Sequence, residues 1–211
     1  MTKPDPPSSW HQRFEALEAE VASGLIERLR LKPFLRGFPR RVALAGFVFI
    51  NGFLTTGLLA LVAMLSGSPF VFPSVGPTVF LFFFHPTTPP ASPRNAILGH
   101  AVGIVCGYMA LVLVGLQHAP SAMAEGVDPG RMWAAAISLA LTGAIMILFR
   151  VVHPPAGATT LIVSLGIIHE PFHLAMIELA IVLLAVQAFA INRLAGVDYP
   201  WWTAKRRRET E

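Results

Sequence analysis

The feature that most constrains the fold of this chain is the body between Arg41 and Asn192, which carries very few charged side chains. Of the 211 residues, 54% are apolar and 13% are charged, whereas a soluble domain carries roughly 25% charged residues. Most charges lie before Arg41 or after Asn192. Such a body needs lipid as its solvent, so the sequence predicts an integral membrane protein and excludes a soluble enzyme.

The net charge of +4 does not indicate nucleic-acid binding, because the basic residues flank hydrophobic stretches, where they set membrane topology. Cys106 is the only cysteine, so no disulfide framework is expected within one chain. No cleavable signal peptide is predicted, because residues 1–41 are polar and charged and the first apolar run is too long for a signal sequence.

Residues 1–41 form the first predicted unit, a cytoplasmic segment that contains an amphipathic helix. Its apolar residues recur at helical spacing on one face; they are Trp10, Phe14, Leu17, Val21 and Leu25. Arginine and lysine follow them, which favours a helix lying on the cytoplasmic membrane surface. A helix that docks on a partner protein is the alternative.

Four uncharged or nearly uncharged stretches are close to the length of about 20 residues that spans a bilayer; they are 42–65, 97–116, 132–149 and 173–191. Two further apolar stretches, 73–84 and 155–168, are too short to cross a hydrocarbon core about 30 Å thick as helices. Each begins with prolines and a glycine, which interrupt one helix and start the next. They are therefore predicted as short helices preceded by non-helical chain.

The two short stretches share the pattern P-x-x-G-x-T, which starts at Pro73 and again at Pro154. Each lies between two long spans. The sequence therefore predicts an all-α membrane protein with six hydrophobic segments, arranged as two inverted three-helix repeats in which the middle helix is short and broken. The repeats are residues 42–116 and 132–192, joined by an external loop at 117–131 and followed by a basic cytoplasmic tail at 193–211.

Charge gives an independent test of this topology. With six crossings and a cytoplasmic N-terminus, Arg94, Arg150, Arg193 and the basic run 205–208 all lie on the cytoplasmic side, as the positive-inside rule requires. Among the lysines and arginines that follow the first span, only Arg131 lies on the outer side in this topology. If the short stretches were re-entrant hairpins, the chain would cross four times and Arg94 would lie outside, so six crossings are favoured. An uncleaved basic N-terminus suits a bacterial inner membrane with both termini cytoplasmic.

The short helices are expected to begin near the middle of the membrane. A helix N-terminus presents unpaired N–H groups and about half a positive charge, so two such ends form an anion site without lysine or arginine. The predicted anion-binding residues follow the two breaks: Gly76, Thr78, Gly157, Ala158, Thr159 and Thr160. The alternative is that these glycines and prolines only kink tightly packed helices.

Histidines and one carboxylate add candidate groups. His153, directly before Pro154, is expected to contact the anion or position the broken segment. His85, His100 and His153 could instead ligate a metal or haem iron, but the sequence has neither a His-x₃-His pair nor an acidic cluster, so no cofactor is predicted. Glu178 and His100 are candidates for proton coupling at related places in the two repeats, unless Glu178 simply reaches interfacial water.

Gly99, Gly103 and Gly107 form a stripe on one face of the second long span. This spacing lets another helix approach closely. Packing is the predicted purpose, either within the chain or between two copies in a homo-oligomer.

The stretch from His153-Pro154-Pro155 through Ala-Gly-Ala-Thr-Thr resembles the HPP family of integral membrane proteins, which is named for this tripeptide. The stretch from His85-Pro86 to His100 is similar to the family's other well-marked region. The resemblance covers about residues 39–191. It implies a transporter-like role, since some members are associated with nitrite transport. The family is usually described with four spans, and two short broken helices would explain the difference from six.

The sequence therefore predicts membrane transport of a small inorganic anion, most consistent with nitrite, through a site formed by the two broken-helix N-termini. Two alternatives stay open, namely a histidine-based redox or metal-binding protein and a non-transporting membrane scaffold. Catalysis is not expected, because no convincing nucleophile–base pair for an intramembrane hydrolase is evident.

Overall fold

The computed structural model describes residues 15, 19 and 39–204, which are helical or irregular with no strand among them. Four helices are long and apolar enough to cross a membrane; they are α3 (Arg40–Ser66), α5 (Pro93–Leu113), α7 (Pro129–Leu148) and α9 (Pro171–Leu194). All four predicted spans are thus confirmed as helices. Apart from residues 15 and 19, the predicted surface helix lies outside the described residues, as does the basic run 205–208.

Both predicted short helices are present. Helix α4 (Val75–Phe84) has 10 residues and α8 (Ala156–Ser164) has 9, so each is about 15 Å long or slightly less. The remaining helical pieces are the one-turn helix α6 (Ala122–Glu125) and the 3₁₀ turn η1 (Pro89–Ala91). Neither short helix could span the bilayer alone.

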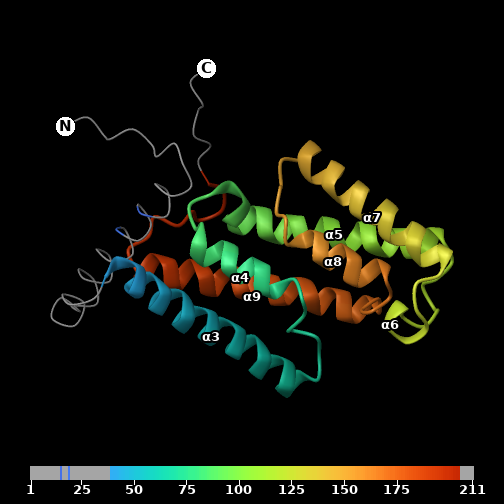
Figure 1. The fold of residues 1–211 in the computed structure, drawn as a ribbon, viewed down its shortest axis with the longest axis horizontal. Coiled ribbons are helices and arrows are strands. Elements are labelled where there is room, and N and C mark those ends of the chain that lie inside the picture. The colour runs from blue at the N-terminus through green and yellow to red at the C-terminus, as the bar shows by residue number, and fades with distance from the viewer. Residues whose placement is uncertain (1–14, 16–18, 20–38, 205–211) are drawn as a thin grey trace.

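The direction of each helix is visible in Figure 1. Helices α3 and α5 run from the end where α3 begins to the opposite end, and α7 and α9 run back. Helix α4 runs with α7 and α9, while α8 runs with α3 and α5, and both begin about midway along the long helices. The beginnings of two oppositely directed short helices therefore lie in the middle of the molecule.

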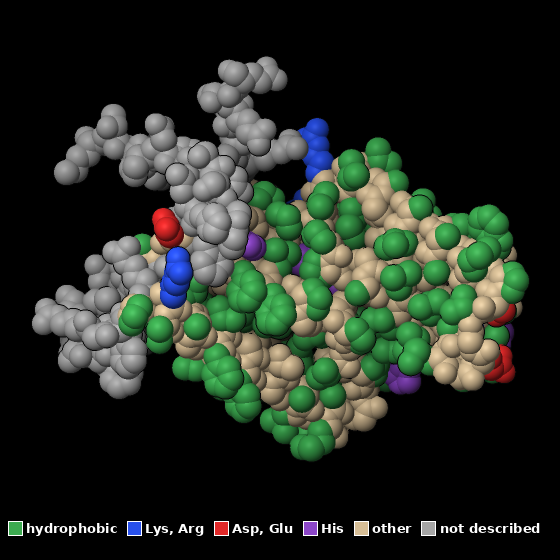
Figure 2. All heavy atoms as spheres, viewed as in Figure 1, with side chains coloured by type: hydrophobic (Ala, Val, Ile, Leu, Met, Phe, Trp, Pro, Cys, Tyr) green, Lys and Arg blue, Asp and Glu red, His purple; other side chains and the backbone are tan. Residues whose placement is uncertain are grey.

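The exterior of the helical body is apolar. Large hydrophobic side chains are exposed along the long helices, including Phe49 (74%), Leu65 (76%) and Leu148 (76%). Figure 2 shows hydrophobic side chains spread over the face in view, with few charged side chains among them. Such a large exposed apolar surface is unfavourable in water but compatible with lipid, so the structure supports an integral membrane protein.

The glycine stripe packs against α8 of the same chain. A Cβ on Gly99 would lie 2.7 Å from the Cβ of His153, and one on Gly103 would lie 2.8 Å from the carbonyl oxygen of Ala156. A Cβ on Gly107 would meet the carbonyl oxygen of Thr160 at 2.8 Å. The stripe is thus covered within the chain, and the expectation that it joins two protomers is wrong, because no space remains for a second copy.

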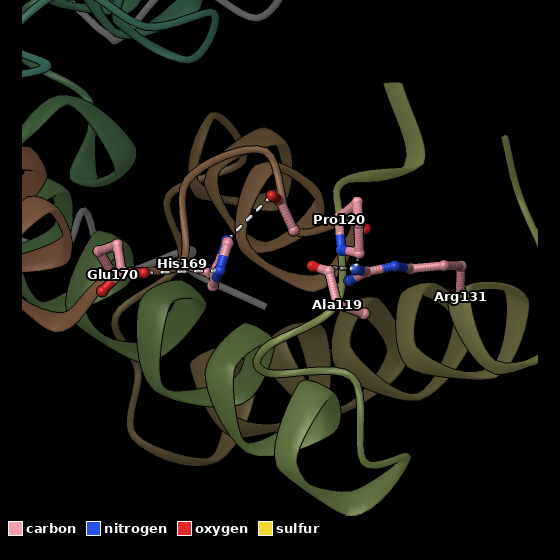
Figure 3. A network of polar contacts seen from close by, with 6 residues as sticks. Ala119, Pro120, Arg131, His169 and Glu170 are labelled. Atoms are coloured by element: carbon pink, nitrogen blue, oxygen red, sulfur yellow. Dashed lines mark hydrogen bonds and ion pairs between the residues drawn. The ribbon is translucent and has the colours of Figure 1, made fainter. Parts of the chain in front are cut away.

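Arg131, the exception to the predicted positive-inside pattern, lies in the first turn of α7 and is 1% exposed. Its guanidinium donates hydrogen bonds to the carbonyl oxygens of Ala119 and Pro120 at 3.2 and 2.7 Å, and more weakly to that of Ser164 at 3.5 Å. Figure 3 shows the side chain reaching the 119–120 carbonyls. Because a helix C-terminus attracts a cation, Arg131 caps the end of α8. These carbonyl contacts explain its position without any role in setting the membrane orientation.

Residues 195–204 fold back over the end of α9. Tyr199 is fully buried, and its hydroxyl donates to the carbonyl oxygen of Ala91 at 2.6 Å. The backbone N–H of Arg94 donates to the carbonyl oxygen of Trp202 at 3.0 Å. Burial raises the pKa of the Tyr199 phenol well above its ordinary value, so it stays a donor. This segment fixes the η1 turn, which in turn contacts the candidate site.

We expect Gly103→Ala to destabilise the protein far more than Gly57→Ala. The added methyl at 103 would overlap α8, whereas a Cβ on Gly57 meets nothing within 4 Å. Overpacking of this kind costs about 1–3 kcal/mol. The melting temperature of detergent-purified protein measures the difference, and equal melting temperatures for the two variants would contradict this packing.

Candidate functional site

The beginnings of α4 and α8 meet in a buried group of hydroxyls and imidazoles, which we name the hydroxyl–imidazole cluster. Each member is fully buried and bonds to at least one other member. Its members are Ser74, Thr78, His100, His153 and Thr159. They come from both short helices, from α5 and from the irregular chain before α8, so segments distant in sequence build one polar site.

Two contacts join the short helices across the cluster. The Ser74 and Thr159 hydroxyl oxygens lie 2.6 Å apart. His100 bridges the two threonines, with Nδ1 at 2.7 Å from the Thr159 hydroxyl and Nε2 at 3.2 Å from the Thr78 hydroxyl. Thr78 and Thr159 are the threonines of the repeated P-x-x-G-x-T pattern, so the two matching motifs converge on one imidazole.

His153 completes the cluster from the other side of Thr78. Its Nε2 lies 3.3 Å from the Thr78 hydroxyl, and its Nδ1 lies 2.8 Å from the carbonyl oxygen of Pro90. Because a carbonyl oxygen can only accept, Nδ1 carries a proton. The His100 and His153 rings are 5.0 Å apart between centroids, so two imidazoles share one site shielded from water.

The start of α5 holds the irregular chain that carries His153. The side-chain amide of Asn95 donates to the carbonyl oxygen of Val152 at 3.1 Å, and the guanidinium of Arg94 donates to that of Arg150 at 2.8 Å. These bonds satisfy carbonyl groups that the helix break leaves without partners. The Arg94-Asn95 pair thus belongs to the site's support, which explains its place in the second motif region.

The predicted backbone donors are used elsewhere. The N–H groups of Gly157 and Ala158 donate to the carbonyl oxygens of Pro154 and Pro155 at 3.0 and 3.1 Å, so they do not point at a ligand as expected. Gly76 is exposed, and a Cβ there would meet nothing within 4 Å. The prolines before α8 continue the turn, so side chains and not free N–H groups form the site.

Thr160 is also predicted as a binding residue, but it anchors α8. Its hydroxyl donates to the carbonyl oxygen of Gly103 at 2.8 Å and lies 2.7 Å from the Thr142 hydroxyl on α7. It therefore locks α8 to α5 and α7, outside the hydroxyl–imidazole cluster.

His100 and Glu178 do not share a hydrogen-bond network. His100 bonds to Thr78 and Thr159, whereas both carboxylate oxygens of Glu178 are buried with no hydrogen-bond partner in the described part of the chain. Glu178 remains a buried ionisable group on α9, and such groups in membrane spans are often functional.

Sequence reasoning missed Ser74 and the role of His100 within the site. Ser74 directly follows Pro73 in the first motif, which was the signal available. His100 directly follows Gly99, whose missing side chain lets α5 approach His153. That second signal could be interpreted only once the partner helix of the stripe was known.

The metal alternative required His85, His100 and His153 to come together. His100 and His153 are in contact, and the part of the chain that the structure describes contains no group of three histidine, cysteine or acidic side chains able to hold a metal. Two imidazoles without a third protein ligand are a poor fit to a resident metal.

Comparison with known proteins bears on the whole helical body. The family model described as HPP, transmembrane region, matches residues 39–200. A transmembrane protein of Dictyostelium discoideum is 29% identical over 172 residues, which is 74% of this chain and 51% of that protein. The chain therefore spans about half the length of this relative. No solved structure matches this chain.

Disulfide cross-linking tests whether the short helices meet. In a Cys106→Ala background, Ser74→Cys with Thr159→Cys should form a disulfide on oxidation, because the two oxygens are 2.6 Å apart. With a protease site inserted near exposed Met123, cleaved halves should stay joined until reduced. Each single cysteine variant is the control, and separation of the oxidised halves would contradict the cluster.

Proposed function

The chain belongs to the HPP family of integral membrane proteins, and we propose that it transports a small inorganic anion, with nitrite as the first candidate. The observation that carries the proposal is the hydroxyl–imidazole cluster. It gathers O–H and N–H donors at the beginnings of two opposed helices, in a body that otherwise presents lipid-compatible side chains. The family resemblance to nitrite transporters points to the same class of ligand.

The chemistry of the cluster suits a small monovalent anion. Hydroxyls of Ser74, Thr78 and Thr159 can turn to donate, and the positive ends of α4 and α8 favour negative charge. No lysine or arginine belongs to the cluster, so no permanent positive charge would hold the ion and it could be released again.

The main helix contacts group the chain into two bundles. Helices α3, α4 and α9 contact one another, as do α7, α8 and α5, and α5 also packs on α9. Exchanging α3 with α7, α4 with α8 and α5 with α9 turns one set of contacts into the other. This correspondence, with the opposed directions in Figure 1, supports two inverted repeats and six crossing segments.

We infer that the moving bodies are these bundles and not the sequence repeats, because α5 is locked to α8 through the glycine stripe. The contacts Ser74–Thr159, Thr78–His100 and Thr78–His153 all cross between the bundles. An anion that replaced them would bridge the bundles instead. Rocking about the α5–α9 contact would then open the site to either side.

A hollow of about 670 Å³ lies where the two bundles meet beyond the end of α3. Its lining includes Gly67, Ser68 and Pro69 from the connection after α3, His169 from the connection after α8, and His173 from the first turn of α9. The chain from Pro69 leads directly to Ser74. We take this hollow as the outer entrance. Positive residues at the opposite end support cytoplasmic termini, as in a bacterial inner membrane.

Catalysis is the second candidate, because the Thr159 hydroxyl lies 2.7 Å from Nδ1 of His100. This contact has the geometry of a nucleophile–base pair. The other nitrogen of His100 faces the Thr78 hydroxyl and not a carboxylate that would stabilise an imidazolium. Transport is therefore the better-supported function, and scaffolding through the glycine stripe loses its basis.

Uptake into proteoliposomes tests the proposal. Thr159→Val should raise the KM for nitrite about tenfold or more, since a lost hydrogen bond to a charged group costs about 1.5–3 kcal/mol. The matched control is Thr55→Val, which removes an equally buried hydroxyl that bonds only to carbonyl groups of its own helix. Wild-type protein that moves neither nitrite, nitrate nor chloride would refute transport, and equal KM values for both variants would refute the site.

A further inference from the structure

The hydroxyl–imidazole cluster has more hydrogen-bond contacts than protons, and this imbalance has a functional consequence. Six short contacts join its polar atoms: Ser74 to Thr159, Thr159 to His100, His100 to Thr78, Thr78 to His153, Thr78 to the Ser74 carbonyl oxygen, and His153 to the Pro90 carbonyl oxygen. Each hydroxyl supplies one proton, and so does each neutral imidazole. Three hydroxyls and two imidazoles therefore supply five protons for six contacts.

The place of the missing proton follows from the carbonyl contacts. His153 donates from Nδ1 to Pro90 at 2.8 Å, so its Nε2 has no proton in the neutral form. The Thr78 hydroxyl donates to the carbonyl oxygen of Ser74 at 2.8 Å. Thr78 and Nε2 of His153 then face each other with lone pairs at 3.3 Å, which is the longest of the six contacts. Turning the hydroxyls moves the gap but cannot fill it.

We propose that the cluster binds one proton together with one monovalent anion, so that transport is electroneutral. This inference rests on the proposed anion-transport function and assigns its coupling. The proton enters at Nε2 of His153 and completes the set of contacts. The resulting imidazolium is fully buried, and a buried charge without a partner is costly. A monovalent anion at the cluster neutralises it, so proton and anion stabilise each other.

In the described part of the chain, no other ionisable side chain forms a hydrogen bond or an ion pair with His153. The ionisable groups on the surrounding elements are His85 at the end of α4, His100 on α5, Arg94 at its start, Arg150 before His153, Tyr199 on the folded-back segment and Glu178 on α9. Arg94 donates to main-chain carbonyl groups and Tyr199 to Ala91. His100 is the ring in contact with His153, and one proton shared by two adjacent imidazoles is favoured over two because like charges repel.

The stoichiometry also defines the class of substrate. One proton balances one negative charge, so nitrite, nitrate, formate or chloride would fit, whereas sulfate would leave a net negative charge in a site without lysine or arginine. Release reverses uptake: the proton leaves Nε2 of His153 to the side where the anion departs. No charge crosses the membrane in a full cycle.

Nitrogen-15 NMR of histidine-labelled full-length protein tests the protonation directly, with His153→Gln used for assignment. Without added anion, His153 should show one protonated and one bare nitrogen. Saturating nitrite should protonate both nitrogens, whereas the same concentration of sulfate should not. A His153 that stays neutral in saturating nitrite would overturn the inference, whether or not uptake is observed.

Flux measurements separate this inference from transport itself. Wild-type proteoliposomes should take up one proton per nitrite, with a rate that does not change when valinomycin and a potassium gradient impose a membrane potential. His153→Gln should lose acceleration by an inward proton gradient, and the control His118→Gln, in an exposed loop, should keep it. Saturable nitrite uptake driven by the potential without proton movement would overturn the coupling while leaving anion transport in place.

Discussion

The constraint on which the rest of the structure depends is that backbone polar groups in lipid must find partners within the protein. Two helix breaks in the middle of the body expose such groups around residues 67–74 and 149–155. At the second break, side chains from the start of α5 satisfy such carbonyl groups: Asn95 reaches Val152 and Arg94 reaches Arg150. The second break is tolerated because this helix is adjacent to it.

Close approach of α5 depends in turn on the absence of side chains. At Gly99, Gly103 and Gly107 the backbone of α5 lies so near the chain of α8 that any Cβ would overlap it. Helix association in lipid relies on such packing, because burial of apolar surface gives little advantage there. Glycine packing and carbonyl satisfaction therefore act together: one brings α5 to the break, and the other keeps the break stable.

Much of the fold could be predicted from the sequence, because long uncharged stretches and proline-glycine breaks are local signals. The four spans and both short helices are confirmed close to their expected residues. Which helices pack against each other was harder to predict from the sequence, since the glycine stripe does not reveal which helix covers it. Arg131 shows the same limit, because its charge suggested a topology conflict while its real partners are carbonyl groups brought near by folding.

The candidate site was predicted in position but not in chemistry. The repeated threonines were found because the motif places Thr78 and Thr159 equivalently, and His153 because it precedes the break. The expected N–H donors were wrong at Gly157 and Ala158, since the prolines before α8 contribute carbonyl groups that accept those protons. A helix that begins with an additional turn loses free donors there, and hydroxyls must take their place.

The location of the cluster links binding to motion. Within each bundle, close packing and bonds to main-chain carbonyl groups hold helices together, as at Thr160 and Gly103. Between the bundles, the hydroxyl–imidazole cluster uses side chains that can turn, gain a proton or accept a different partner. Rigid contacts thus define the bodies, and exchangeable contacts define the boundary between them. A ligand that competes for the exchangeable contacts changes the energy of that boundary, which is what coupling substrate binding to a conformational change requires.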